Sequence, residues 1–307
     1  MKKSLSIFAL AALVFVGCVK DLDYDFEDTD PKVVVISCVE PGLPVNLRIT
    51  YSRFFLSTAP FRTVDNAVVK LQVNGAETDA EVYYLNERYV VDYRPQPGDR
   101  LDLSVQVPGH GTVSASTVVP TPADVSNIRT SKQVNEDGDT TCILHFNLQD
   151  PADEDNYYFV RIRSYEELNG RRSSYFNYLP FYCSDPLIVE NADVVDIIDG
   201  IEGGNPNEWK GRQLYFLDGN IAGRNHEMEI SFKAAKNYST DHNYAYQMEI
   251  TTLTRDRYLY EVTTDLYSGD ELEAIFSDPV QIHHNIDGGI GIFAARNTML
   301  VDIPQHP

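Results

Sequence analysis

Short runs in which apolar and polar residues alternate recur along the chain from residue 32 onward. Residues 45–51 alternate in this way, and residues 101–107 repeat the pattern with Leu101, Leu103 and Val105 on one side. Successive side chains of a strand point to opposite faces, so each run predicts a strand with one buried face. Similar runs lie at 32–39, 68–73, 81–85, 88–93 and 112–119. About seven short strands over residues 31–120 predict an N-terminal β-sandwich of immunoglobulin or fibronectin type.

Turn residues separate these runs and mark a boundary. Asn74-Gly75 is a strong hairpin signal, and Pro120-Thr121-Pro122 interrupts the strand pattern. We therefore predict a second, C-terminal β-rich domain over residues 121–307. Its strands are expected at 141–148, 157–164, 213–217, 227–233, 244–253, 279–282, 290–294 and 299–303, with a long loop over 184–211. The predicted fold class is mainly β.

One segment of the second domain has helical spacing. Thr254 can cap a helix, Leu259, Val262 and Leu266 then fall on one face, and Gly269 follows as a stop signal. The apolar face is narrow. We expect one short helix that lies on the second sheet.

The first residues form a leader. Lys2 and Lys3 precede an apolar stretch from Leu5 to Val16, too short for a spanning helix, which needs roughly 20 residues. The stretch ends at Gly17-Cys18 and resembles a bacterial lipobox, although Phe15 stands where Leu is usual. The resemblance implies a signal peptide over 1–17 and acyl chains such as palmitate on Cys18, which would then hold the protein on membrane lipid. The alternative is an ordinary cleaved signal with Cys18 as an incidental thiol.

An acidic tether follows over residues 18–30, with Lys20 as its only base. It resembles the tethers that direct lipoproteins to the outer face of the outer membrane in Bacteroidetes-type bacteria. The run can also be a plain solvated linker, because like charges repel and keep a segment extended, and the two interpretations can hold together. The alternative location is retention facing the periplasm.

The overall charge excludes one class of partner. Loss of Lys2 and Lys3 with the leader takes the formal net charge from −21 to −23. Nucleic-acid binding depends on cations that neutralise phosphates, so it is excluded. Electrostatic docking on anionic lipid is disfavoured for the same reason.

Three cysteines remain after Cys18, and their odd number and long spacing do not predict a disulfide framework. Cys38 and Cys142 lie in apolar strand-like runs, so buried free thiols are expected. A disulfide bond between Cys142 and Cys183 is the alternative.

Two segments are candidates for binding. Residues 175–182 are rich in aromatic side chains, and Tyr175, Phe176, Tyr178, Phe181 and Tyr182 form a candidate interaction surface if they are exposed. Core packing is the alternative.

The acidic loop over residues 149–156 offers several oxygen ligands. Asp150, Asp153 and Asp155 are candidate calcium ligands, although the loop lacks EF-hand spacing. A turn between two strands explains the loop without a metal, so no cofactor is expected beyond a possible structural calcium.

The sequence shows no catalytic motif. There is no G-x-S-x-G elbow and no P-loop, His226-Glu227 lacks the second histidine of a zinc helix, and His283 and His284 would point to opposite faces of a strand. We therefore predict that the protein is not an enzyme.

Several runs resemble the family catalogued as domain of unknown function 4249. They are the lipobox with residues 33–36, Asp150-Pro151 with residues 156–162, Asp278-Pro279-Val280, and above all residues 285–293 with Gly288, Gly289 and Gly291. The glycines also have a physical explanation, since they allow positive φ or close backbone approach.

The resemblance covers the whole chain, and no catalytic residue carries over from it. The family is similar to surface lipoproteins of Bacteroidetes that are often encoded beside TonB-dependent transporters. It implies an outer-membrane, non-catalytic accessory component of nutrient uptake. An adhesin or structural surface protein is the alternative, and a hydrolase is the third choice.

Overall fold

The structure is a computed structural model that describes residues 30–54, 57–152, 154–189, 192–193, 209–235, 242–267 and 281–304. The leader, Cys18, the tether up to residue 29, Asp153 and the expected helix stop Gly269 lie outside the described residues. None of the helices in the described part has the length and apolarity needed to cross a membrane.

The described chain is mainly β, as the alternating pattern predicts. Two helices are present, α2 (Pro186–Val189) and α3 (Arg255–Tyr267). The strands are β1 (Val33–Val39), β2 (Val45–Tyr51), β3 (Val68–Val73), β4 (Ala76–Glu77), β5 (Val82–Leu85), β6 (Arg88–Val91), β7 (Arg100–Val107), β8 (Gly111–Val118), β9 (Asp124–Val134), β10 (Thr140–Gln149), β11 (Tyr157–Leu168), β12 (Arg171–Leu179), β13 (Phe181–Cys183), β14 (Ala192–Asp193), β15 (Trp209–Gly211), β16 (Leu214–Leu217), β17 (Asn225–Lys233), β18 (His242–Leu253) and β19 (Ile290–Asp302).

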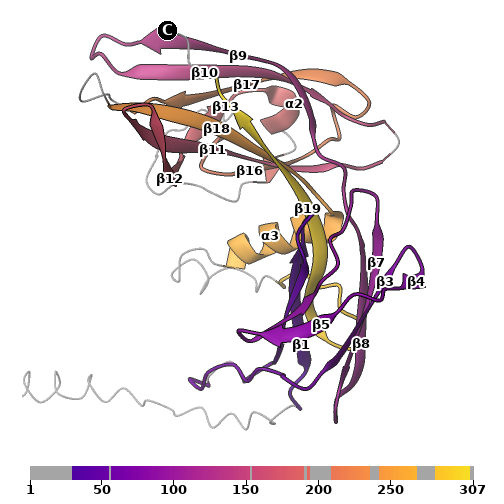
Figure 1. Cartoon of the computed structure of the whole chain (residues 1–307). Helices are drawn as coiled ribbons and strands as arrows, with labels where there is room; N and C mark the ends of the chain where they lie inside the picture. Colours follow the sequence, from indigo (N-terminus) through magenta and orange to yellow (C-terminus); the bar gives the residue numbers. More distant parts are fainter. Residues whose placement is uncertain are drawn as a thin grey trace, which may run out of the picture.

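Among the described residues these strands form three sheets. A ten-stranded sheet has the order β14-β16-β11-β18-β19-β1-β2-β6-β5, with β12 paired to β11. A five-stranded sheet (β15-β13-β17-β10-β9) packs on one half of it, and a four-stranded sheet (β4-β3-β7-β8) packs on the other half. The result is two sandwiches that share one sheet (Figure 1).

Strand β19 joins the two sandwiches. Its first half, Ile290–Ala295, pairs in parallel with Val34–Val39 of β1, and its second half, Arg296–Asp302, pairs antiparallel with Gln247–Leu253 of β18. Figure 1 shows the yellow strand running from one sandwich into the other. Its 13 residues span about 43 Å at strand rise. The two closing strands expected at 290–294 and 299–303 are therefore one strand, because no turn residue separates them.

This strand also changes the division of the chain. The sequence places everything after residue 120 in the second domain, but Phe293 and Ala295 belong to the core of the N-terminal sandwich. Parallel pairing between distant segments leaves no local signal in a sequence. The N-terminal sandwich thus consists of residues 31–120 and the first half of β19.

The glycine run is explained by its approach to β1. Gly291 has a φ of +111°, and a Cβ added there would lie 2.0 Å from the carbonyl oxygen of Val35. A Cβ on Gly289 would lie 2.7 Å from the carbonyl oxygen of Val33. A side chain at either position would force the two backbones apart.

Asn285, the first residue of the same motif, forms hydrogen bonds with the backbone of β19. The Asn285 amide donates to the Phe293 carbonyl at 2.9 Å and accepts from the Phe293 amide at 2.9 Å. Strand β18 no longer covers β19 at this point, so the side chain replaces a neighbouring strand. Asp287 then exchanges backbone hydrogen bonds with Ser114 of β8.

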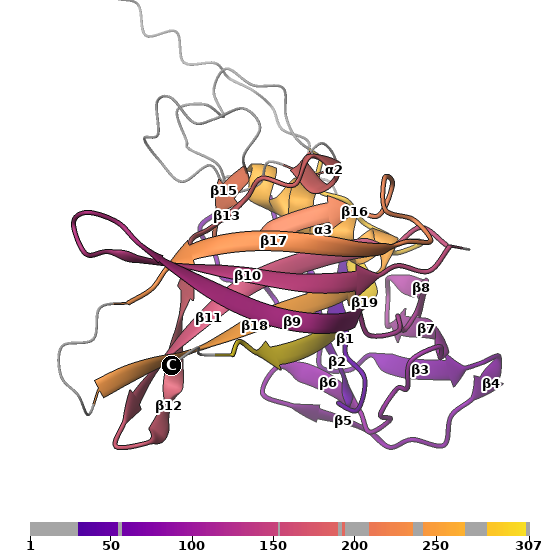
Figure 2. The ribbon, with the colours of Figure 1, turned by 90° about the horizontal axis from the view of Figure 1, so that it is seen from above.

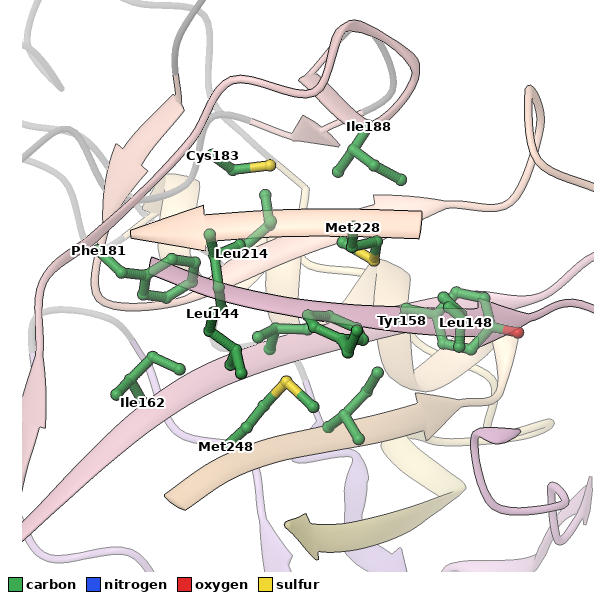
Figure 3. Close-up of a cluster of buried hydrophobic side chains, with 14 of the residues drawn as sticks. Leu144, Leu148, Tyr158, Ile162, Phe181, Cys183, Ile188, Leu214, Met228 and Met248 are labelled. Carbon is green, nitrogen blue, oxygen red and sulfur yellow. The ribbon is translucent and has the colours of Figure 1, made fainter. Parts of the chain in front are cut away.

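The core of the C-terminal sandwich lies between β10, β13 and β17 on one side and β11, β16 and β18 on the other (Figures 2 and 3). Leu144 and Leu148 face Tyr158, Ile162 and Met248 across the layer. Full burial of such side chains stabilises the fold by about 1.5–3 kcal/mol each.

Helix α3 lies on the outer face of the large sheet, as expected. The Thr254 hydroxyl accepts a hydrogen bond from the Arg257 amide at 3.4 Å, which is an N-cap contact. Tyr258 and Val262 are buried against Tyr157 and Leu253. The cap thus forms where it was predicted. Of the predicted stripe, Val262 is buried and Leu259 is partly buried, the Leu266 side chain lies outside the described ones, and Tyr258 was not predicted.

Candidate functional site

A row of alternating arginine and aromatic side chains covers the outer face of β11 and β12. Phe159, Arg161, Arg163 and Tyr165 lie two residues apart on β11, so they share one face. In the register of the pair, Arg163 stands opposite Tyr178, and Tyr165 stands opposite Phe176. We call these six residues, with Arg172, the arginine–aromatic face.

The guanidinium groups of this face stack on the rings. Arg161 lies 4.5 Å from the ring centroid of Phe159 and 4.6 Å from that of Tyr178. Arg163 lies 4.5 Å from the centroid of Phe176, and Arg172 lies 5.3 Å from that of Tyr165. Each contact is within cation–π range, so neighbouring side chains hold one another in place.

A buried carboxylate fixes the centre of the face. Arg163 donates from Nε and Nη2 to Glu249 Oε2 at 2.8 and 2.6 Å, and the Tyr178 hydroxyl donates to the same oxygen at 3.3 Å. Glu249 is only 4 % exposed, so its charge depends on these donors. Arg172 pairs with Asp302 at 3.0 Å. The face is rigid, and two of its arginine charges are compensated.

The aromatic segment predicted at 175–182 divides at Pro180. Tyr175 is 84 % exposed and Phe176 is 38 % exposed, and Tyr178 is half-buried. Phe181 is fully buried in the core of the C-terminal sandwich, so it is not part of a binding surface. Tyr182 lies on β13 in the five-stranded sheet, where Lys210 stacks over its ring at 5.0 Å. Phe176 and Tyr178 belong to the candidate site, whereas Tyr175 points to the other side of β12.

The arginines of the face were not among the residues picked out from the sequence. The period-two spacing of Arg161 and Arg163 with Phe159 and Tyr165 could have identified them as one surface. Their stacking partners on β12 could not be found in this way, because a β-bulge shifts the register between Tyr165 and Glu167.

The acidic loop proposed for calcium has a structural role at Asp150. The Asp150 carboxylate accepts hydrogen bonds from the Tyr158 hydroxyl at 2.7 Å and from the Gly223 amide at 3.3 Å. Asp155 is exposed, and Asp153 is outside the described residues. In the described part of the chain, no three His, Cys, Asp or Glu side chains are grouped to hold a metal ion. A calcium ion there stays a prediction.

The Tyr158–Asp150 contact gives a testable stability effect. Burial raises the pKa of Asp150, so its ionised form is disfavoured in the fold and the stability that this group contributes falls as pH rises through that pKa.

Tyr158→Phe removes a hydrogen-bond donor to the ionised Asp150 carboxylate and should cost about 1–3 kcal/mol of unfolding free energy at pH 7. The loss should shrink in acid, where Asp150 is protonated. Urea denaturation at several pH values measures it, and Tyr175→Phe is the exposed control. An equal loss at all pH values would contradict the assigned cause.

The three described cysteines are free thiols. Cys142 and Cys183 are buried in the C-terminal core and do not form the disulfide that the sequence left open. Burial raises the pKa of Cys38 and of Cys142, which disfavours their reactive thiolates.

Two of the three histidines flagged in the sequence, His226 and His283, are paired with carboxylates. His226 contacts Asp185, and His283 Nε2 lies 2.8 Å from Asp256 Oδ1 at the first turn of α3. Both contacts tie a loop to a neighbouring element.

A shallow groove of about 330 Å³ between β8 and the start of α3 contains three carboxylates, those of Asp102, Asp256 and Asp287. Asp102 pairs with Arg100 at 2.9 Å, and Asp256 accepts a hydrogen bond from the Asn285 amide at 3.1 Å. The Asp256 carboxylate ties the start of α3 to the segment before β19, and Asp102 pairs with Arg100 on its own strand, so we assign the groove a structural role.

Comparison with solved structures gives weak similarities. The collagen adhesin of S. aureus is 7 % identical, with 90 % of this chain and 93 % of that chain covered and a TM-score of 0.19. The collagen-binding domain of the Erysipelothrix rhusiopathiae surface protein RspB is 10 % identical, with coverages of 88 % and 96 % and a TM-score of 0.19. TM-scores this low carry no argument about this chain. No curated protein matches the sequence.

A family model gives a specific match. The model described as Domain of unknown function (DUF4249) matches residues 19–299, which contain both sandwiches and the Asn285–Phe293 motif that joins them. Because this match covers most of the chain, the protein belongs to the DUF4249 family.

Proposed function

We propose that this protein is a lipid-anchored, non-catalytic binding component at the outer-membrane surface that assists a TonB-dependent transporter in nutrient uptake. The leader ending at Cys18 and the acidic tether support the anchor and the location. The resemblance of the family to surface lipoproteins supports the transporter as the partner.

The arginine–aromatic face is the observation that carries the binding role. Tyr, Phe and Arg are enriched at protein interfaces, and here they lie on rigid strands with little side-chain entropy left to lose. Phe176 is the most exposed ring of the face, at 38 %, whereas Phe159 and Tyr165 are 5 % and 8 % exposed. Tyr175 alternates with Phe176 and lies on the opposite side of β12, so it is not part of the face. A protein partner would contact mainly Phe176, Tyr178 and the arginine side chains.

The position of the face suits a partner above the membrane. Strand β1 begins at the end of the N-terminal sandwich that points away from the C-terminal sandwich, because β1 runs parallel to β19. The tether therefore enters at one end of the molecule, and the arginine–aromatic face lies in the other sandwich. A partner that extends from the membrane into the medium can reach it.

The tandem sandwiches favour one alternative. An adhesin or structural surface protein needs a stiff spacer, and a single strand that runs through both sandwiches supplies one. Deletion of the protein would then alter attachment and leave nutrient uptake unchanged, whereas the proposed function predicts the reverse.

In-cell cross-linking tests the proposed partner. A transporter barrel should co-purify with the parent protein, and Phe176→Ser should reduce its recovery about fivefold or more, since exposed aromatic hot spots are worth at least 1 kcal/mol. Leu85→Ser, which alters an exposed residue of the N-terminal sandwich, is the matched control and should leave recovery unchanged.

Two results would count against the proposal. Recovery of no outer-membrane barrel would remove the partner. An unmodified thiol on Cys18 of the mature protein, found by mass spectrometry, would remove the anchor.

A further inference from the structure

The loop between β2 and β3 lies where the tether enters the folded body. The Lys32 amide donates to Ser52 Oγ at 2.9 Å, and the Ser52 amide donates to the Lys32 carbonyl at 2.8 Å. The Tyr51 amide donates to the Arg62 carbonyl at 2.9 Å, which closes the base of the loop. The two ends of the loop, at Tyr51–Ser52 and at Arg62, are therefore fixed beside the first residues that follow the tether.

This loop presents aromatic side chains to solvent. Phe61 is 51 % exposed and Phe54 is 37 % exposed. The Arg53 guanidinium lies 4.4 Å from the ring centroid of Phe61, and the Arg62 guanidinium lies 4.3 Å from that of Tyr51. We call Arg53, Phe54, Phe61 and Arg62 the anchor-side loop.

Three cations, Lys32, Arg53 and Arg62, lie at this end of a chain that has 46 acidic and 25 basic residues. Among the described residues none of the three forms an ion pair with a carboxylate, and Arg53 donates a hydrogen bond to the Ala59 carbonyl. Acidic neighbours such as Asp30 and Asp65 do not neutralise them by direct contact.

Exposed phenylalanine beside arginine that has no carboxylate partner fits the head-group region of a bilayer. Aromatic rings settle at the boundary between lipid and water, and a guanidinium group binds phosphate with two parallel hydrogen bonds. The net charge of −23 opposes long-range attraction to anionic lipid, but charges beyond about 8 Å are screened at physiological ionic strength. Contact at this site therefore depends on the local side chains.

We propose that the anchor-side loop is a second, peripheral contact with the membrane, and that it seats the N-terminal sandwich on the lipid head groups. The inference rests on the proposed lipid anchor, which brings the body to the surface. A fully extended tether of residues 19–30 would reach up to about 40 Å. The tether alone would therefore leave the orientation of the two sandwiches relative to the membrane unrestricted. The loop would fix this orientation and hold the C-terminal sandwich away from the bilayer.

Vesicle partitioning of the mature full chain without acyl groups tests the loop directly. The chain with Cys18→Ser is mixed with phosphatidylethanolamine–phosphatidylglycerol vesicles and sedimented. The pair Phe54→Ser and Phe61→Ser should lower the partition coefficient at least about tenfold, from the apolar area lost. The matched control pair, Leu43→Ser and Leu168→Ser, removes exposed apolar residues elsewhere and should change it less than about twofold.

A spectroscopic reading gives an independent check. The natural Trp209 lies on β15 in the C-terminal sandwich, so Phe61→Trp adds a reporter at the other end. A quencher attached to the lipid chains should quench the added tryptophan and leave Trp209 emitting. Equal partitioning of the loop and control pairs, or no quenching of the added tryptophan, would overturn the proposal.

These outcomes are separate from a failure of the anchor. If Cys18 carries no lipid but the loop pair still loses vesicle binding, the proposed function fails and the loop contact stands. If Cys18 is acylated and the loop pair behaves like the control pair, only the loop contact fails.

Discussion

Gly291→Ala should cost about 4 kcal/mol or more of unfolding free energy, one of the largest losses available to a single substitution in this chain. The added Cβ would lie 2.0 Å from the Val35 carbonyl oxygen, at a φ of +111° that side chains rarely adopt. Backbone cannot move aside as a side-chain end can, so β1 and β19 must separate. Because β19 also belongs to the C-terminal sandwich, the loss should reach both sandwiches. Urea denaturation followed by circular dichroism measures it.

Gly111→Ala is the matched control for this prediction. Gly111 has a φ of +81°, but a Cβ there would meet no atom within 4 Å. Only the conformational strain remains, about 1–2 kcal/mol. A similar loss in the two variants would show that φ, and not the approach to Val35, governs Gly291.

Local patterns in the sequence predict local structure well in this protein. Residues 45–51 form β2 as their alternation predicts, and Thr254 caps α3. The polar edge strand β9 was missed, because its side chains are mostly exposed and show little apolar alternation. Strand patterns depend on one buried face, and β9 buries little.

Long-range pairing limits the prediction of the domains and the site. The parallel pairing of β1 with β19 joins opposite ends of the chain, and nothing near either strand encodes it. The same limit applies to the aromatic segment, where Tyr175 and Phe181 have the same character in the sequence but opposite exposures, 84 % and 0 %. The chain changes sheets at Pro180, between β12 and β13, and this change decides which ring is exposed.

Arg163→Ala should cost about 3–5 kcal/mol, because it leaves the buried Glu249 carboxylate without its main partner. The paired variant Arg163→Met with Glu249→Leu removes both charges and replaces them with apolar side chains. It should recover most of the loss, since the desolvation cost of the pair disappears with it. A double-mutant cycle built on Arg163→Ala and Glu249→Ala, measured by urea denaturation, gives the coupling energy. A coupling near zero would contradict the assigned pairing.

The paired variant also separates folding from binding at the arginine–aromatic face. Its stability should be close to that of the parent, but the guanidinium that stacks 4.5 Å from Phe176 is gone. If the face binds a partner, cross-linking to the transporter should fall with the stability unchanged. If the arginines serve only to bury Glu249, cross-linking should stay at the parent level, and the binding role would have to be given up. Removal of the stacked Arg163 guanidinium thus distinguishes a face that binds a partner from a face whose arginines only stabilise the fold.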